Sequence, residues 1–311
     1  MAACYYGNTM AQNGSPTTES LDSLKTGRDV RLFARNHECP PTSGLAPTYL
    51  QANLIALPSR YASDFRVLCA RNPVPCPLIA ESAGAGAWGA VKSHLGSVLD
   101  GGAILGEGAD IRRDIPRYNV YVDSALAKPD ARDVVADWTD DHVAFLIGCS
   151  YSFETALADA GLAPLHAALG RNIAMYRTGV PLCPAGVFTG GTYVVSMRAY
   201  RAADVERVRE ITRPYVATHG EPLAWGWDAV RALGIADIDV PDWGDAPLAR
   251  DGRKLGAYRG SDELVPVFWG CGVTPQEAVM RAGLQGVVMS HSPGYMLALD
   301  IRDSDILDKQ S

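Results

Sequence analysis

Two stretches of the chain decide how it folds: Ala144-Phe-Leu-Ile-Gly-Cys-Ser-Tyr-Ser-Phe-Glu-Thr-Ala-Leu157 and Pro266-Val-Phe-Trp-Gly-Cys-Gly-Val-Thr-Pro-Gln-Glu-Ala-Val279. Each begins as a short apolar run typical of a buried strand, passes through Gly-Cys, and continues into a helix-like segment. In the second stretch we expect Thr274 to be the helix N-cap, Pro275 to take the first helical position and Glu277 to close a capping box. Both stretches therefore predict a strand, a turn and a helix.

The two stretches align without a gap, so that Ser152 falls where Thr274 stands and Glu154 where Gln276 stands. A weaker match continues from residues 172–178 to 286–292 and from 194–198 to 296–300. We therefore predict an internal duplication of a strand–turn–helix–strand unit. In that arrangement the two Gly-Cys turns can face each other across a pseudo-twofold axis.

Four further segments carry local structural signals. The apolar run Tyr49–Pro58 predicts a buried strand, and Tyr61–Ala70 predicts a helix with Phe65 and Leu68 on one side. Residues 71–77 hold three prolines and cannot be helical, because proline lacks an N–H donor and fixes φ. Tyr118–Val122 predicts an edge strand.

The domain organisation follows from composition. Residues 1–24 are polar and rich in small residues, so we expect a flexible N-terminal tail. Residues 25–311 are expected to form a single α/β catalytic domain of mixed sheets with flanking helices, which can divide into subdomains at about 25–140 and 141–311.

Bulk composition narrows the class of protein. The 311 residues are 47% hydrophobic and 20% charged, an ordinary globular mix. The net charge of −7 argues against nucleic acid and anionic membranes as partners, because both favour a basic face. The sequence has no apolar run of the roughly 20 residues that a membrane span requires, and no N-terminal signal segment. We expect a cytoplasmic homo-oligomer.

The seven cysteines are scattered, so they do not indicate a disulfide scaffold. The chain has no CxxC pair or HxxxH cluster, so a structural zinc site is not expected. Glycine patterns for nucleotide binding and a GxSxG elbow are also absent. We expect no cofactor, although the many Asp and Glu residues leave a divalent metal open.

A strand that turns through glycine into a helix presents unpaired backbone N–H groups, which favour an anion. The two Gly-Cys turns can therefore bind a carboxylate or a developing oxyanion. At such a place Cys149 and Cys271 can have a lowered pKa and act as nucleophiles. The alternative is that both are small buried packing residues, as most free cysteines are.

Four polar residues are candidates for the chemistry. Glu154 is either a general acid or base or a surface carboxylate that complements the helix dipole. His291 is either a proton carrier or a structural residue. Arg177 and Arg198 end strand-like runs and can grip a carboxylate or form structural ion pairs. For His219 we favour a structural role. Further candidates for substrate binding are Asn53, Tyr176, Thr178, Ser196 and Tyr295.

Nine segments in order along the chain carry a resemblance to a known family. They are Tyr49–Leu54, Arg71–Leu78, Ala144–Glu154, Met175–Thr178, Val194–Arg198, His219–Pro222, Pro241–Asp245, Phe268–Gln276 and His291–Gly294. Together they resemble the D-glutamate cyclase-like family of hydro-lyases. The resemblance implies an α/β fold and, in one branch of the family, conversion of D-glutamate to 5-oxo-D-proline with loss of water.

This chain departs from the family pattern at three places. The pattern usually has glycine where Thr48 stands, a second histidine where Tyr295 stands, and Gly-Asp-Pro where this chain has Gly226-Trp-Asp228. Histidine titrates near pH 6.5 and tyrosine near 10, so a proton shuttle at position 295 would be altered.

We therefore expect a hydro-lyase that dehydrates or cyclodehydrates a small carboxylate. Arg177 or Arg198 would hold a carboxylate, the Gly-Cys turns would stabilise the oxyanion, and Glu154 or His291 would move the proton. Two alternatives remain at this stage. One is a cysteine-dependent acyl-transfer or tailoring enzyme of a biosynthetic pathway, and the other is a non-catalytic protein that binds small acids.

Overall fold

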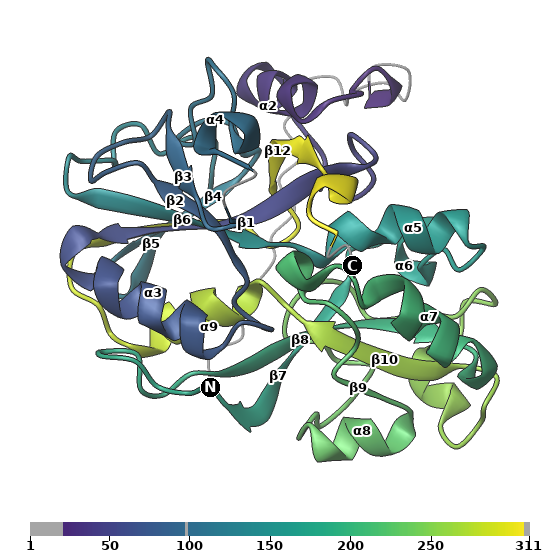
Figure 1. Cartoon of the computed structure of the whole chain (residues 1–311). Coiled ribbons are helices and arrows are strands. Elements are labelled where there is room, and N and C mark those ends of the chain that lie inside the picture. Colours follow the sequence, from purple (N-terminus) through teal and green to yellow (C-terminus); the bar gives the residue numbers. More distant parts are fainter. Residues whose placement is uncertain (1–20, 97–98, 308–311) are drawn as a thin grey trace.

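Figure 1 shows the computed structural model of the chain, which describes residues 21–96 and 99–307. Most of the predicted N-terminal tail, residues 1–24, lies outside the described residues, but Leu21 and Leu24 pack in a buried cluster with Val30. Within the two described ranges no helix is long and apolar enough to cross a membrane.

The α-helices are α2 (Gly27–Asn36), α3 (Ala62–Arg71), α4 (Gly101–Ile104), α5 (Glu154–Asp159), α6 (Leu165–Ala168), α7 (Val205–Thr212), α8 (Trp227–Ala232) and α9 (Val273–Arg281). The 3₁₀ helices are η1 (Ser59–Tyr61), η2 (Ser150–Phe153), η3 (Ala202–Asp204), η4 (Val216–Thr218), η5 (Leu255–Tyr258) and η6 (Asp303–Asp305). The strands are β1 (Tyr49–Pro58), β2 (Leu78–Ser82), β3 (Val91–Ser93), β4 (Tyr118–Val122), β5 (Ala125–Ala131), β6 (His142–Gly148), β7 (Ala174–Pro181), β8 (Thr192–Tyr200), β9 (Ala224–Trp225), β10 (Val265–Gly270), β11 (Val287–His291) and β12 (Leu297–Arg302).

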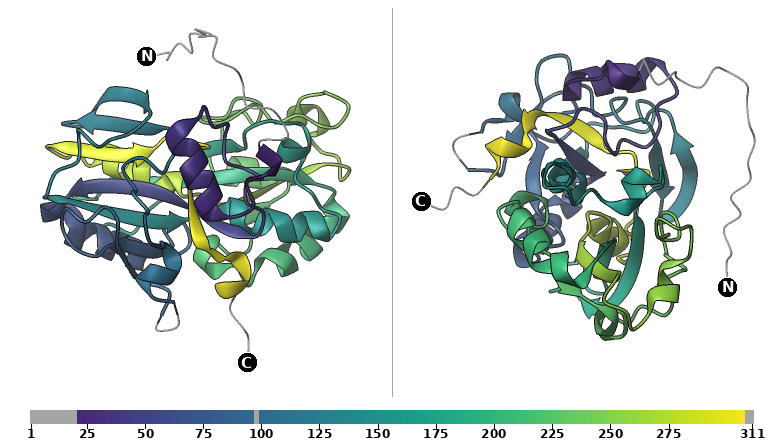
Figure 2. Two further views of the ribbon diagram at one scale, coloured as in Figure 1. Left: turned by 90° about the horizontal axis from the view of Figure 1, so that it is seen from above. Right: turned by 90° about the vertical axis from the view of Figure 1, so that its right-hand side faces the viewer.

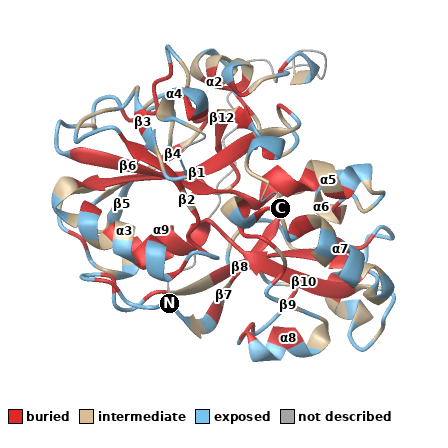
Figure 3. Cartoon of the chain, in the orientation of Figure 1, coloured by how far each residue is buried: buried red, intermediate tan, exposed pale blue. Residues whose placement is uncertain are grey.

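The strands form two antiparallel sheets flanked by helices, which confirms the predicted α/β fold. The larger sheet has the order β3-β2-β6-β1-β11-β4-β5, and β12 also pairs with β1. The smaller sheet has the order β7-β8-β10-β9. Figure 3 shows that strands near the centre of both sheets are largely buried, whereas the outer faces of α3 and α8 are exposed.

Both faces of the larger sheet are buried, because the side chains of β1 alternate between two apolar clusters. Leu54 points into one cluster with Ile104 of α4. Ile55 points into the other, where it packs with Phe65 of α3 and Val279 of α9. This double burial explains why Tyr49–Pro58 is a continuous apolar run.

The smaller sheet is covered in the same way. Tyr176 and Phe268 pack with Val230 of α8 on one face. Trp269 packs with Val208 of α7 on the other face, which is turned toward η2 and α5.

The local predictions hold for β1, which spans Tyr49–Pro58, and for α3, which begins and ends one residue later than expected. The prediction that residues 71–77 are not helical holds for 72–77, whereas Arg71 is the last residue of α3. The prediction that Tyr118–Val122 is an edge strand is wrong. Residues 125–131 turn back and pair outside it as β5, so that β4 is the second strand from the edge.

Each of the two predicted units begins with a strand of one sheet and ends with strands of the other sheet. One begins with β6 in the larger sheet and continues through α5 to β7 and β8 in the smaller sheet. The other begins with β10 in the smaller sheet and continues through α9 to β11 and β12 in the larger sheet. Both Gly-Cys segments therefore follow a strand and precede a helix, while their common origin by duplication stays a prediction.

The predicted cap of α9 is wrong. The helix begins at Val273, so Thr274 and Pro275 lie inside its first turn and Gly272 is the N-cap. The Thr274 hydroxyl instead bonds to the backbone of Val194 in β8, accepting from its N–H at 3.0 Å and donating to its carbonyl at 3.1 Å. The carboxylate of Glu277 pairs with two arginines and closes no capping box.

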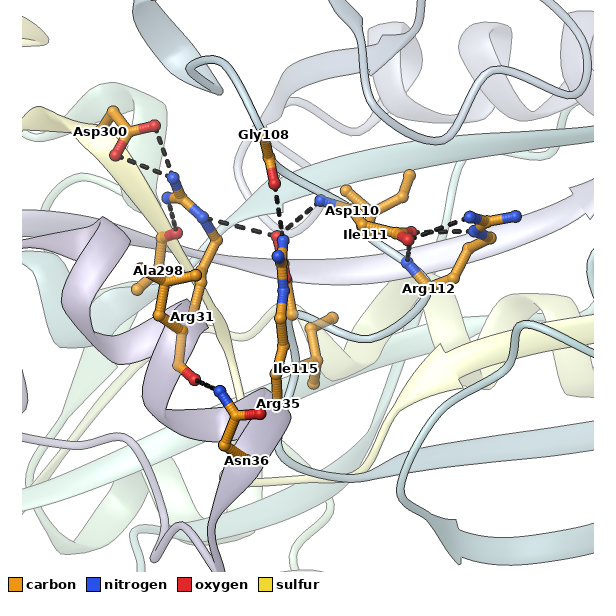
Figure 4. A network of polar contacts seen from close by, with 12 residues as sticks. Arg31, Arg35, Asn36, Gly108, Asp110, Ile111, Arg112, Ile115, Ala298 and Asp300 are labelled. Atoms are coloured by element: carbon orange, nitrogen blue, oxygen red, sulfur yellow. Dashed lines mark hydrogen bonds and ion pairs between the residues drawn. The ribbon is translucent and has the colours of Figure 1, made fainter.

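Helix α2 is tied to the larger sheet by a buried ionic network (Figure 4). The Arg31 guanidinium donates to the carbonyl of Ala298 in β12 at 2.8 Å and to Asp300 at 2.7 Å. It also lies 3.5 Å from the carboxylate of Asp114, which is fully buried. Arg35 donates to the same carboxylate. Figure 2 shows from two further sides that α2 lies against β12.

We predict that Arg31→Met lowers the free energy of unfolding by about 3 kcal/mol, because removal of one partner leaves a buried carboxylate uncompensated. Chemical denaturation measures this change. The matched control is Arg28→Met on the same helix, whose side chain is exposed and whose replacement should change stability by less than about 0.5 kcal/mol. Equal effects of the two substitutions would contradict a clamping role for Arg31.

Candidate active site

The ends of β6 and β10 meet at one buried place between the two sheets. Cys149 follows β6 and Cys271 follows β10, and both side chains belong to the same apolar cluster. Tyr151, Val273 and Met296 complete its core together with residues of β7 and β8. We call the segments Gly148–Ser150 and Gly270–Gly272 together the paired turns.

Close approach of other backbone and side-chain atoms explains the glycines in these turns. A Cβ on Gly148 would lie 1.9 Å from the carbonyl oxygen of Ala217. A Cβ on Gly272 would lie 1.9 Å from the amide nitrogen of Asn53. Neither position can hold a larger residue without displacing its neighbour.

Asn53 connects the two turns. Its side-chain nitrogen donates to the carbonyl of Gly148 at 3.0 Å, and its amide packs directly on Gly272. Asn53 lies where β1 changes partner, because β1 pairs with β12 up to Ala52 and with β11 from Ile55. This split in the sheet brings the buried side chain of Asn53 to the meeting point of the turns, while its predicted contact with substrate stays a prediction.

His291, the last residue of β11, lies beside Leu54 at the place where β1 changes partner. The backbone N–H of Leu54 donates to its Nδ1 at 3.1 Å, and the Gln276 side-chain nitrogen lies 2.8 Å from that atom. The ring is fully buried, and Nε2 has no partner within residues 21–96 and 99–307. Burial lowers the pKa of His291 to about 4, so its imidazole is neutral near pH 7. A neutral imidazole can accept a proton or donate one hydrogen bond, so the role of His291 as a proton carrier stays a prediction.

The pKa values of the two cysteines favour the packing interpretation over a nucleophilic thiolate. Burial raises the pKa of Cys149 to about 12 and that of Cys271 to about 11. Each sulfur accepts the backbone N–H two residues ahead, at Tyr151 and Val273, but this contribution is smaller than the cost of burying a thiolate. Both cysteines are neutral thiols that line the paired turns.

Behind the first turn lies a buried ion pair between Arg198 and Glu154. The Arg198 Nε donates to Glu154 Oε1 at 2.9 Å, and its terminal nitrogens donate to the hydroxyls of Ser150 and Ser196. Burial alone would raise the pKa of Glu154, but Arg198 and His166 outweigh it, and the pKa is lowered. Glu154 is therefore an ionised buried carboxylate, not the surface residue of the alternative interpretation.

Glu154 also reaches a pocket. With Tyr151, Ser152 and Gln51 it lines a hollow of about 170 Å³ whose opposite wall is the segment 43–49. Both contacts of Arg198 and the 3.3 Å contact of His166 go to Oε1. Within the described residues no hydrogen bond goes to the other carboxylate oxygen, Oε2.

Arg177 stands apart from these groups. It forms two parallel bonds to Glu277, of 2.8 and 3.0 Å, and a third to Asp242 at 2.8 Å. The guanidinium lies over the ring of Trp243 and is about a third exposed, at 36%. Three of its donors go to protein carboxylates, which is the structural ion pair weighed as the alternative.

Three other candidates for substrate binding make contacts outside the paired turns. Tyr176 donates to the carbonyl of Ile238 in the opposite core of the smaller sheet. The Thr178 hydroxyl donates to the carbonyl of Tyr193 at 2.8 Å. Tyr295 packs against the first cluster of the larger sheet, and its burial raises the pKa of its hydroxyl.

His219 has the structural role that the sequence favoured, but at the site itself. Its Nδ1 bonds to the carbonyl of Val74 at 2.8 Å, and its ring lies against Gly270. Burial lowers its pKa to about 4. Its backbone is left-handed, with φ of 87°.

Sequence reasoning missed His166 and the contact of Gln276 with His291. The segment around His166 carries no motif, and α6 is one turn long. Gln276 lies in one of the two aligned stretches, at the position matching Glu154, but the sequence carries no signal for its contact with His291. Among the described residues no group of three or more His, Cys, Asp or Glu side chains is arranged to hold a metal.

Comparison with known proteins agrees with this arrangement. Residues 143–300, which include both paired turns, match the family described as D-glutamate cyclase. A protein named "Putative hydro-lyase" from Burkholderia ambifaria is 45% identical over 266 residues, which cover 86% of this chain and 92% of that protein. A relative with the same designation from Schizosaccharomyces pombe is 41% identical over 285 residues, 91% of this chain and 85% of its own. A third, from Rubrobacter xylanophilus, is 42% identical over 275 residues, 87% of this chain and 93% of its own.

These matches place the chain among the hydro-lyases, the enzymes that break a carbon–oxygen bond with release of water. Within that class it belongs to the D-glutamate cyclase family.

We predict that a thiol-alkylating reagent near neutral pH modifies Cys183 and leaves Cys149 and Cys271 unmodified. Cys183 is exposed, whereas the other two are buried and lack thiolate character. Peptide mass spectrometry measures the three sites separately, and labelling in denaturant is the control for recovery. Modification of Cys149 or Cys271 as fast as that of Cys183 would revive the nucleophilic interpretation.

Proposed function

We propose that the chain cyclodehydrates a glutamate-like amino acid at the paired turns, as in the conversion of D-glutamate to 5-oxo-D-proline. The observation that carries the proposal is the convergence of two strand-to-helix turns around Asn53, beside a neutral buried His291. The family description supports the same substrate class.

The reaction balances without a redox partner. The amine nitrogen attacks the distal carboxyl carbon, so that one carbon–nitrogen bond forms and one carbon–oxygen bond breaks. One N–H proton leaves with the hydroxyl group as water. Holding the amine and the carboxyl carbon of one molecule in contact supplies much of the rate enhancement.

Glutamate carries two carboxyl groups, and the site offers two turns. The N–H groups at the start of η2 and of α9 have no backbone acceptor within their own helices, and those of Tyr151 and Val273 donate only to neutral thiols, so each turn favours negative charge. One turn would hold the α-carboxylate, and the other would stabilise the tetrahedral oxyanion. The buried Nε2 of His291 would donate a further hydrogen bond to that oxyanion, a role suited to a neutral imidazole.

Glu154 is the candidate base. Its lowered pKa keeps it ionised near neutral pH, and it lines the pocket next to the first turn. It would take the amine proton and return it to the departing hydroxyl group. The donors of Arg198 go to Glu154, Ser150 and Ser196, so we assign Arg198 to orienting and charging Glu154. The contacts of Arg177 support no direct contact with substrate.

The first test is direct. We expect the purified protein to convert D-glutamate to 5-oxoproline, and chiral chromatography with mass spectrometry measures the product and its configuration. L-glutamate and D-glutamine are the comparison substrates. Binding of D-glutamate without release of water, by protein that unfolds cooperatively on heating, would contradict the proposal.

We further predict that Gly272→Ala lowers kcat/KM by about 100-fold, because the new methyl group displaces the Asn53 amide and shifts the turn by about 1 Å. Gly190→Ala is the matched control, since Gly190 is exposed and a Cβ there meets no atom within 4 Å. Thermal unfolding of both variants separates a local shift from loss of fold. Equal activity of the two variants would remove the paired turns from the mechanism.

A further inference from the structure

We infer that Gln276 is a positioning residue that holds His291 as the tautomer with hydrogen on Nε2, so that the ring presents a donor to the substrate. This inference rests on the proposed role of His291 at the paired turns. It goes beyond that role because it assigns the residue that sets the state of the ring.

The contacts of the Gln276 amide fix its orientation. Its nitrogen lies 3.1 Å from the backbone carbonyl of His291, which can only accept a hydrogen bond. The amide nitrogen, not the oxygen, must therefore face this carbonyl. The same nitrogen lies 2.8 Å from Nδ1 of the ring.

The groups around Nδ1 decide which ring nitrogen carries the hydrogen. Two donors converge on it, the Gln276 amide at 2.8 Å and the Leu54 N–H at 3.1 Å. One acceptor competes, the Leu54 carbonyl at 3.2 Å. If Nδ1 carried the hydrogen, the Leu54 N–H would lose its acceptor and the Gln276 amide would face a second donor, so Nδ1 is the unprotonated nitrogen. The hydrogen of the neutral ring is then on Nε2.

This arrangement leaves the Nε2–H group of His291 without a hydrogen-bond acceptor in the described part of the chain. Nε2 is buried, and a buried donor without a partner is unfavourable. A substrate carbonyl or oxyanion would satisfy it, which makes the orphaned donor a binding group.

An amide side chain at position 276 favours the tautomer with hydrogen on Nε2 of His291. In the aligned stretches Gln276 takes the place of Glu154, and each lies five residues beyond its Gly-Cys cysteine. Glu154 faces a cation, Arg198, whereas Gln276 faces a neutral ring. A carboxylate at 276 would accept a hydrogen from Nδ1 and favour the other tautomer or the imidazolium.

The test is the nitrogen NMR spectrum of protein labelled with ¹⁵N-histidine, in which protonated and unprotonated ring nitrogens have separate shifts. The His291 signals are assigned by their loss in His291→Asn. We expect the wild-type ring near neutral pH to be protonated at Nε2 alone. In Gln276→Glu we expect hydrogen on Nδ1, and a fall in kcat of about 100-fold with a smaller change in KM. In Gln276→Met we expect a mixture of tautomers and an intermediate kcat.

Gln285→Glu and Gln285→Met are the matched controls, because Gln285 is exposed and lies in the loop that follows the same helix. Both should keep the wild-type spectrum and kcat. A wild-type ring with hydrogen on Nδ1, or an unchanged tautomer in both Gln276 variants, overturns the inference. If D-glutamate is not a substrate, the spectra still decide the tautomer, so failure of the inference and of the proposed function are distinguishable.

Discussion

The ion pair between Arg198 and Glu154 is the interaction on which the site depends. Arg198 belongs to β8 of the smaller sheet, and Glu154 begins the helix that follows β6 of the larger sheet. A buried guanidinium is costly unless a partner charge and hydrogen bonds compensate it. Here one carboxylate, two serine hydroxyls and the rings of Phe153 and Trp269 surround it. The pair therefore joins the two sheets where their strands end.

Apart from that pair, the groups at the meeting point of the turns are neutral. Burial lowers the pKa of His219 and His291 to about 4 and raises that of Cys149 and Cys271 above 10. Oriented dipoles act more strongly in such a low-dielectric place than in water. Charge that develops on a reacting carboxyl group would meet backbone N–H groups and an imidazole donor already in position, with little reorganisation.

The sequence predicted those parts of the site whose signals are local. The two Gly-Cys stretches were recognisable because strand, turn and helix follow one another in each, and Asn53 and Glu154 stand in quoted motifs. The errors came from contacts between distant segments. Thr274 was expected to cap its own helix, but β8 supplies stronger partners for its hydroxyl. For Arg177 the sequence left a substrate contact and a structural ion pair open, and only the fold shows that Glu277, 100 residues away, bonds to it. The direction of the thiol pKa shifts depends on burial, which the start of a helix does not reveal.

The two departures from the family pattern that involve single residues have different surroundings. Tyr295 packs on the core of the larger sheet, beside Arg117 and Cys39 and apart from the paired turns. Thr48 instead lines the pocket that Glu154 reaches, and its φ of 72° is one that glycine adopts without strain. A β-branched residue there costs on the order of 1–2 kcal/mol of backbone strain and narrows the pocket by its side chain. Of the two single-residue departures, Thr48 is thus the one that lies at the pocket wall, whereas Tyr295 packs on the core of the larger sheet.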